Sequence, residues 1–64
     1  MEEYTVDIGS FISGRTVKVE AVDVRQALSK ARKLLRHDRF ERVIQIRDDR
    51  DYFYYTYEHG IIEK

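Results

Sequence analysis

The sequence contains no cysteine and no proline, and only three of its 64 residues are glycine. The absence of cysteine excludes disulfides and thiolate metal sites. No apolar run approaches the roughly 20 residues that a membrane-spanning helix needs. The first residues, Met1-Glu2-Glu3, are acidic and lead into alternating polarity, unlike a secretory signal peptide. We therefore expect a cytoplasmic protein with no membrane partner.

The length predicts a single small domain over residues 1–64. A chain this short buries only about 60% of the surface exposed by its unfolded form, so its core is thin. Small domains compensate with staples, well-formed local structure or a partner. Since disulfides are excluded, we expect well-formed local structure or an interaction surface.

The formal net charge is zero, but the charges are segregated along the chain. The segment 25–42 has a formal charge of +5, and the rest of the chain carries −5. The segment holds seven basic side chains against two acidic ones: Arg25, Lys30, Arg32, Lys33, Arg36, Arg39 and Arg42 against Asp38 and Glu41. Such a field steers partners in a way that mean charge does not.

Two alternating segments predict a first β-hairpin. Apolar and polar residues alternate over 4–8 and again over 17–21, the pattern of half-buried strands. A two-residue turn at 13–14 would pair Ile8 with Val19, and a slip by one residue would move every side chain to the other face.

The next segment predicts a helix over 23–37. Asp23 can cap its start, and Gln26 stands at the third position of a capping box. The apolar residues that follow recur at helical spacing and form one stripe. Basic residues crowd the last turns, where cations complement the helix dipole.

A second hairpin is expected from strands at 40–47 and 52–57, joined by the polar turn at 48–51. If Arg47 pairs with Tyr52, then Phe53 and Tyr55 face the helix. The predicted fold is thus α+β, with the order β-β-α-β-β and an antiparallel four-stranded sheet of order 2-1-3-4. One helix packs on one face, and the other face is left uncovered.

No pattern predicts catalysis. The two histidines, His37 and His59, lie in no recognisable motif, and there is no glycine-rich phosphate loop. The acidic turn at 48–51 lacks the glycine and distal glutamate of a calcium loop. We therefore expect no enzyme activity, no cofactor, no metal site and no small-molecule substrate.

The strand at 52–57 is the strongest candidate for an interaction surface. Its first four residues are all aromatic, whereas a strand covered on one side should alternate. Tyrosine is common at protein interfaces, and an edge strand can accept another strand. The alternative is that these tyrosines only stabilise the strand pair. The predicted protein-binding residues are those expected on the uncovered face and at the strand end: Tyr52, Tyr54, Tyr57 and Val43.

The basic segment 25–42 offers an alternative surface for RNA or DNA, because lysine and arginine attract phosphates irrespective of sequence. Its plainer interpretation is an ordinary solvated helix face. We expect Arg25, Arg32 and Arg36 on one flank, and Lys30 and Lys33 on the other. The candidate anion-binding residues are Arg25, Arg32, Lys33, Arg36 and Arg39.

The stretch RTVKVEAVDVRQALSKAR, residues 15–32, resembles a pattern of many small accessory proteins of bacteriophages and their bacterial hosts. In that pattern a strand ending in V-E-A leads through an acidic cap into an A-L-x-K-A helix. The resemblance implies a host-directed binding role in the host cytoplasm, and it carries no site residues. A fainter similarity to a small archaeal-type ribosomal protein, with basic residues after the helix, implies RNA binding.

The sequence therefore favours a non-enzymatic protein-interaction module. It would use the strand at 52–57 and the uncovered sheet face to form a homodimer or to bind, and in the phage-type version to inhibit, a host protein. Nucleic-acid binding through residues 25–42 is the alternative.

Overall fold

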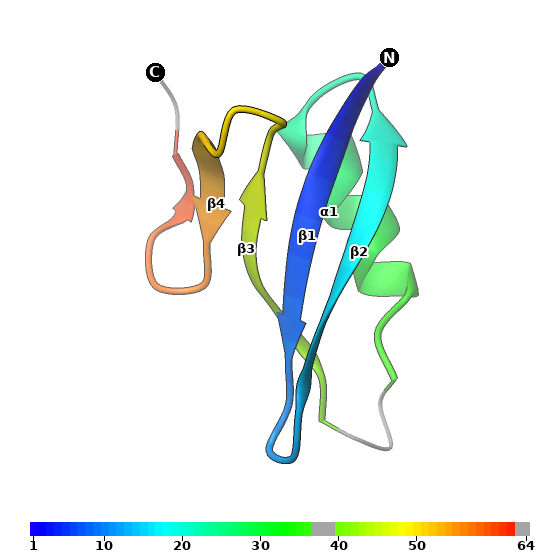
Figure 1. Cartoon of the computed structure of the whole chain (residues 1–64), viewed down its shortest axis with the longest axis vertical. Coiled ribbons are helices and arrows are strands. Elements are labelled where there is room, and N and C mark those ends of the chain that lie inside the picture. Colours follow the sequence, from blue (N-terminus) through cyan, green and yellow to red (C-terminus); the bar gives the residue numbers. More distant parts are fainter. Residues whose placement is uncertain (37–39, 63–64) are drawn as a thin grey trace.

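The computed structural model describes residues 1–36 and 40–62, and within these ranges a single helix lies against one face of an antiparallel sheet (Figure 1). The sheet has the order β2-β1-β3-β4-β5. The elements are β1 (Glu2–Gly9), β2 (Gly14–Ala21), α1 (Val24–Lys33), β3 (Arg42–Arg47), β4 (Phe53–Thr56) and β5 (Gly60–Ile61). The small α+β class predicted from the sequence is confirmed.

A short fifth strand covers the edge that was expected to be open. Ile61 of β5 pairs with Tyr55 of β4, so the sheet has five strands where four were predicted. Gly60, where β5 begins, has a φ of +72°, a left-handed conformation that suits glycine. The free edge on this side of the sheet is therefore β5, and β4 is an inner strand.

The first hairpin forms with a longer loop than predicted. Gly9 pairs with Gly14, and Tyr4, rather than Ile8, pairs with Val19. The register differs from the predicted one by four residues, and an even difference leaves each side chain on its predicted face. Residues 10–13 form the loop in place of a two-residue turn at 13–14.

A bulge in β3 corrects the predicted position of Val43. Ile8 pairs with Val43 and Asp7 with Gln45, so Ile44 is the extra residue. The bulge turns Val43 into the core, where it is 4% exposed, and leaves Ile44 partly open to solvent. The sequence predicted Val43 on the uncovered face, and this prediction is wrong.

A second bulge, in β4, reverses two further predictions. Ile46 pairs with Tyr55 and Arg47 with Phe53, which makes Tyr54 the extra residue. The Tyr54 ring packs edge-on against Tyr4, a core residue, with 5.8 Å between ring centroids. Tyr54 therefore packs against the core and Phe53 is exposed, the opposite of the predicted arrangement.

The helix begins as predicted and ends earlier. The Asp23 side chain accepts a hydrogen bond of 2.9 Å from the Gln26 amide, and the Gln26 side chain accepts one of 2.8 Å from the Val22 amide. The helix ends at Lys33, not at 37, because Leu34 tightens the last turn by bonding to the Ala31 carbonyl. His37 and Arg39 lie outside the described residues.

The core lies between α1 and the sheet. The helix contributes one leucine and two alanines to the core, and the small alanine side chains let the helix lie close to β2 and β3. The buried residues are Tyr4, Val6, Ile8, Val19, Ala21, Ala27, Leu28, Ala31, Val43, Ile46 and Tyr55. Within the described residues, no helix is long and apolar enough to cross a membrane.

Candidate functional site

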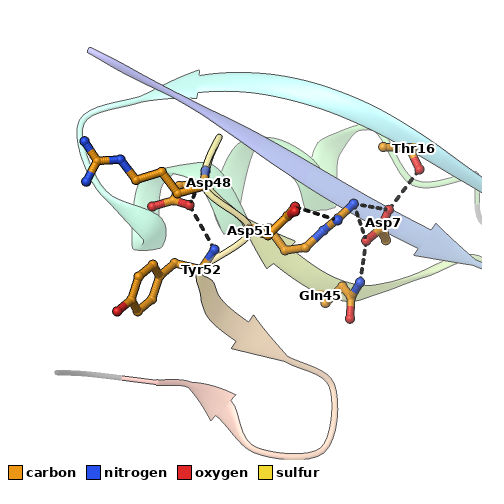
Figure 2. Close-up of polar contacts among 8 residues, drawn as sticks. Asp7, Thr16, Gln45, Asp48, Asp51 and Tyr52 are labelled. Carbon is orange, nitrogen blue, oxygen red and sulfur yellow. Dashed lines mark hydrogen bonds and ion pairs between the residues drawn. The ribbon is translucent and has the colours of Figure 1, made fainter.

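The uncovered sheet face is polar at its centre, where Asp7 of β1 binds neighbours on both sides (Figure 2). Its carboxylate accepts hydrogen bonds from the Thr16 hydroxyl at 2.8 Å and from the Gln45 amide at 2.6 Å. It also pairs with Arg47 at 3.2 Å, and Arg47 bridges on to Asp51 at 3.1 Å. This network joins polar side chains of β2, β1 and β3 on one face, so the centre of that face is no apolar docking surface.

The four residues predicted to bind protein do not form one surface. Val43 lies in the core, and Tyr54 packs against the core cluster. The Tyr54 hydroxyl donates a hydrogen bond of 3.1 Å to Asp48, which raises the pKa of the tyrosine. Tyr52 and Tyr57 are 50% and 56% exposed. Tyr57 lies under the Arg42 guanidinium, whose carbon is 5.0 Å from the ring centre.

The acidic turn between β3 and β4 is organised by Asp48 (Figure 2). Its carboxylate accepts backbone hydrogen bonds from Tyr52 at 2.9 Å and Arg50 at 2.8 Å. These bonds, the one from Tyr52 first, hold the pKa of Asp48 below its usual range. The carboxylate is thus committed to shaping the turn, and no group of three or more metal-ligating side chains occurs among the described residues.

The basic side chains of the helix divide differently from the prediction. Arg25, Arg32 and Lys33 line one groove together, although Lys33 was expected on the opposite flank. Lys30 leans the other way and donates a hydrogen bond of 2.7 Å to the Glu20 carbonyl. Arg36 is exposed beyond the helix end and does not line the groove.

An exposed apolar surface occurs at the end of the first hairpin, where it was not predicted. We call it the apolar tip and define it by four residues: Phe11, Ile12, Phe40 and Ile44. Phe11 and Ile12, at the loop apex, are 85% and 86% exposed, and Phe40 is 67% exposed. Figure 1 shows the β1–β2 loop at one end of the molecule, beside the chain that enters β3.

The serines of the loop hold the two apex side chains outward. The Ser10 amide and hydroxyl both donate to the Ser13 carbonyl, at 2.9 and 2.8 Å. The Ser10 oxygen in turn accepts from the Ser13 amide at 3.2 Å. Because the polar groups are satisfied inside the loop, Phe11 and Ile12 are left at its apex.

Two backbone features shape the rest of the tip. Gly9 gives Ile44 room, since a Cβ there would lie 3.0 Å from the Ile44 side chain. Phe40 has a φ of 54°, a left-handed conformation that is unfavourable for a bulky residue. Its ring nevertheless meets Phe11 edge-on at 6.0 Å, and beside the pair is a hollow of about 300 Å³. Strain of this kind persists only where the surrounding structure enforces it.

A clasp ties the tip to the helix end. Arg15 of β2 forms a two-pronged ion pair with Glu41, at 3.0 and 3.1 Å, and donates a 2.7 Å hydrogen bond to the Leu34 carbonyl. Glu41 also accepts a hydrogen bond of 2.8 Å from the Arg36 amide. The bonds from Arg15 and Arg36 hold the pKa of Glu41 below its usual range. The clasp fixes the residue that directly follows Phe40.

No protein-family model, curated protein or solved structure matches this chain. The candidate site therefore rests on its own geometry. The tip was not predicted because the expected two-residue turn at 13–14 left Phe11 and Ile12 before the turn and not at its apex. The available signal was the pair of serines, Ser10 and Ser13, which flank two large apolar residues.

Proposed function

We propose that this chain is a non-enzymatic protein-interaction module that docks on another protein chain through the apolar tip. The observation that supports the proposal most is the exposure of Phe11 and Ile12 at the apex of a loop closed by its own hydrogen bonds. An exposed cluster of large apolar side chains is typical of an interaction site. The strained backbone of Phe40 supports the same surface.

The tip takes the role that was expected of the strand at 52–57 and the uncovered face. The Asp7 network makes the centre of that face polar. Tyr57 belongs to the neighbourhood of the tip through Arg42, which lines the hollow and covers the tyrosine ring. The aromatic–cationic rim and apolar centre are the usual composition of a protein interface.

The finer form of the proposal is an accessory protein of phage type that binds a bacterial protein. It is supported by the resemblance carried by residues 15–32. A homodimer is the simplest other form, since the knob of Phe11 and Ile12 lies next to a hollow on the same surface.

The experiment compares the wild type with Phe11→Ser plus Ile12→Ser. Both side chains are exposed, so the double variant should fold with nearly unchanged stability. Light scattering after size exclusion measures self-association, and affinity capture from bacterial lysate measures hetero-association. The control, Lys18→Ser, changes an exposed residue of β2. The proposal predicts an association that the control variant keeps and the tip variant loses. It would be refuted if the wild type is strictly monomeric and the tip variant still captures every protein that the wild type captures.

A further inference from the structure

A groove of about 670 Å³ between α1 and the edge strand β5 forms a second surface, with no residue in common with the apolar tip. Figure 1 shows β5 at the edge of the sheet opposite β2. The groove is lined by Arg25, Leu28, Ser29, Arg32, Lys33, Tyr55, Gly60 and Ile61. Three of these residues are cationic, and none of the described residues that line it is acidic.

The cations are arranged along the groove. Arg25 and Arg32 are seven residues apart, which puts them on one helix face about 10 Å apart along the axis. Lys33 stands beside Arg32. All three side chains are exposed. A ligand lying along the groove would therefore meet positive charge at both ends of the helix wall.

The opposite wall is apolar and ends in a strand edge. Leu28 and Tyr55 are buried at the base, and Ile61 packs partly against the core. The Ile62 amide donates to the Tyr54 carbonyl at 2.9 Å, so it points inward to β4. Because successive residues of a strand point their backbone groups in opposite directions, the amide and carbonyl of Ile61 point outward from the sheet.

We propose that this groove binds an extended acidic segment of a partner protein, which adds a strand to β5 and turns alternate carboxylates toward the cations of α1. Alternate residues of a strand are about 7 Å apart and point to the same face. Two or three such carboxylates would span the distance from Arg25 to Arg32. The backbone of Ile61 supplies the pairing. The side chains between the carboxylates point to the opposite face of the sheet, away from α1.

The same cations could attract a nucleic acid, but the groove lacks what single strands need. Binding of single strands relies on exposed aromatic rings on which bases stack. Among the described residues, Tyr55 is the one aromatic residue that lines the groove, and it is buried beneath it. The open strand edge next to the cations favours an extended peptide.

The test uses a labelled, end-capped peptide of alternating glutamate and valine, with fluorescence anisotropy as the readout. The variant Arg32→Gln plus Lys33→Gln should bind about fivefold to tenfold more weakly than wild type. The control, Lys18→Gln plus Arg50→Gln, removes the same charge from exposed sites outside the groove. The control should bind like wild type, and higher salt should weaken wild-type binding.

A second arm tests strand addition without changing the protein. The same peptide is made in two versions, each methylated on alternate backbone nitrogens so that one of its two edges is blocked. The version whose blocked edge would face β5 should lose most of its affinity. Equal weakening in the two charge variants, unchanged affinity of both methylated peptides, or tighter binding of oligothymidine than of the peptide would each overturn the proposal. Because none of these probes involves Phe11 or Ile12, this outcome is independent of the fate of the apolar tip.

Discussion

At the scale of single residues, two bulges decide which side chains are available to partners. Ile44 and Tyr54 are each the extra residue opposite a neighbouring strand. An extra residue interrupts the alternation, so that the residues before it and after it are one step out of phase. Val43 enters the core as a result, while Phe53, opposite Arg47, is exposed.

The position of Val43 leads to a stability prediction. Val43→Ala removes two buried carbons, so it should lower the free energy of unfolding by about 2 kcal/mol. In a domain of this size that lowers Tm by roughly 10 °C. Ile44→Ala, at the partly exposed neighbour, should cost clearly less. Thermal unfolding of the two variants checks this, and equal losses would show that the β3 bulge is misplaced.

Tyr4 gives a prediction at alkaline pH. Burial, with a 3.2 Å hydrogen bond from its hydroxyl to Glu2, raises the pKa of Tyr4 to about 12. A raised folded-state pKa means that the neutral phenol stabilises the fold. This contribution is complete below the unfolded-state pKa of about 10 and is lost as the pH rises to about 12. The free energy of unfolding of Tyr4→Phe, measured by urea unfolding, should therefore fall less than that of wild type between pH 10 and 12. An equal fall in both proteins would contradict a raised pKa of Tyr4.

At the scale of elements, the sequence determined faces better than registers. Alternating polarity put Tyr4, Val6 and Ile8 on one face of a half-buried strand, and the structure buries all three. The register of β1 and β2 still differs by four residues, because any even shift preserves the same faces. The hydrogen bonds between Ser10 and Ser13, which close the loop at 10–13, select one of these registers. The alternation of polar and apolar residues contains no information about these bonds.

The helix shows the same division between signal and context. Asp23 and Gln26 were readable because capping is a local contact. The end at Lys33 was not, since Arg15 reaches the Leu34 carbonyl from a distant strand. The groove likewise depends on β5, and a strand of only two residues, 60–61, has no sequence pattern from which it could be predicted. Local contacts could be predicted, and contacts between distant segments could not.

The clasp, which joins β2 to the residues after α1 and to the residue before β3, should make stability sensitive to acid. The pKa of Glu41 is lowered by its bonds to Arg15 and Arg36, so the carboxylate stabilises the fold. The contribution is present above the unfolded-state pKa of about 4.3 and is lost as the pH falls below it. Glu41→Gln should thus flatten the acid side of the stability curve in urea unfolding.

A second substitution separates the clasp from general acid effects. Arg15→Gln removes the main cause of the lowered Glu41 pKa, so it should flatten the same region of the curve. Combining it with Glu41→Gln should then add little further flattening. Additive effects of the two substitutions would show that the residues do not act through each other.

At the scale of the whole molecule, the formally neutral chain presents unlike surfaces. The apolar tip lies at one end, the Asp7 network at the centre of the uncovered face, and three cations between α1 and β5. Charge segregation was visible in the sequence, although the sequence did not show that Lys33 joins Arg25 and Arg32. The tip was hidden because it joins residues 11–12 with residues 40–44 across the fold.

Photo-crosslinking in bacterial cells tests most directly whether the protein docks through the apolar tip. Phe11 is replaced by a photoreactive phenylalanine derivative, and the same derivative at Lys18 on β2 serves as the control. Docking through the apolar tip predicts a discrete adduct from position 11, with either a second copy or a different protein, and none of the same mass from position 18. Adducts of the same mass from both positions, or none from position 11, would contradict docking through the apolar tip.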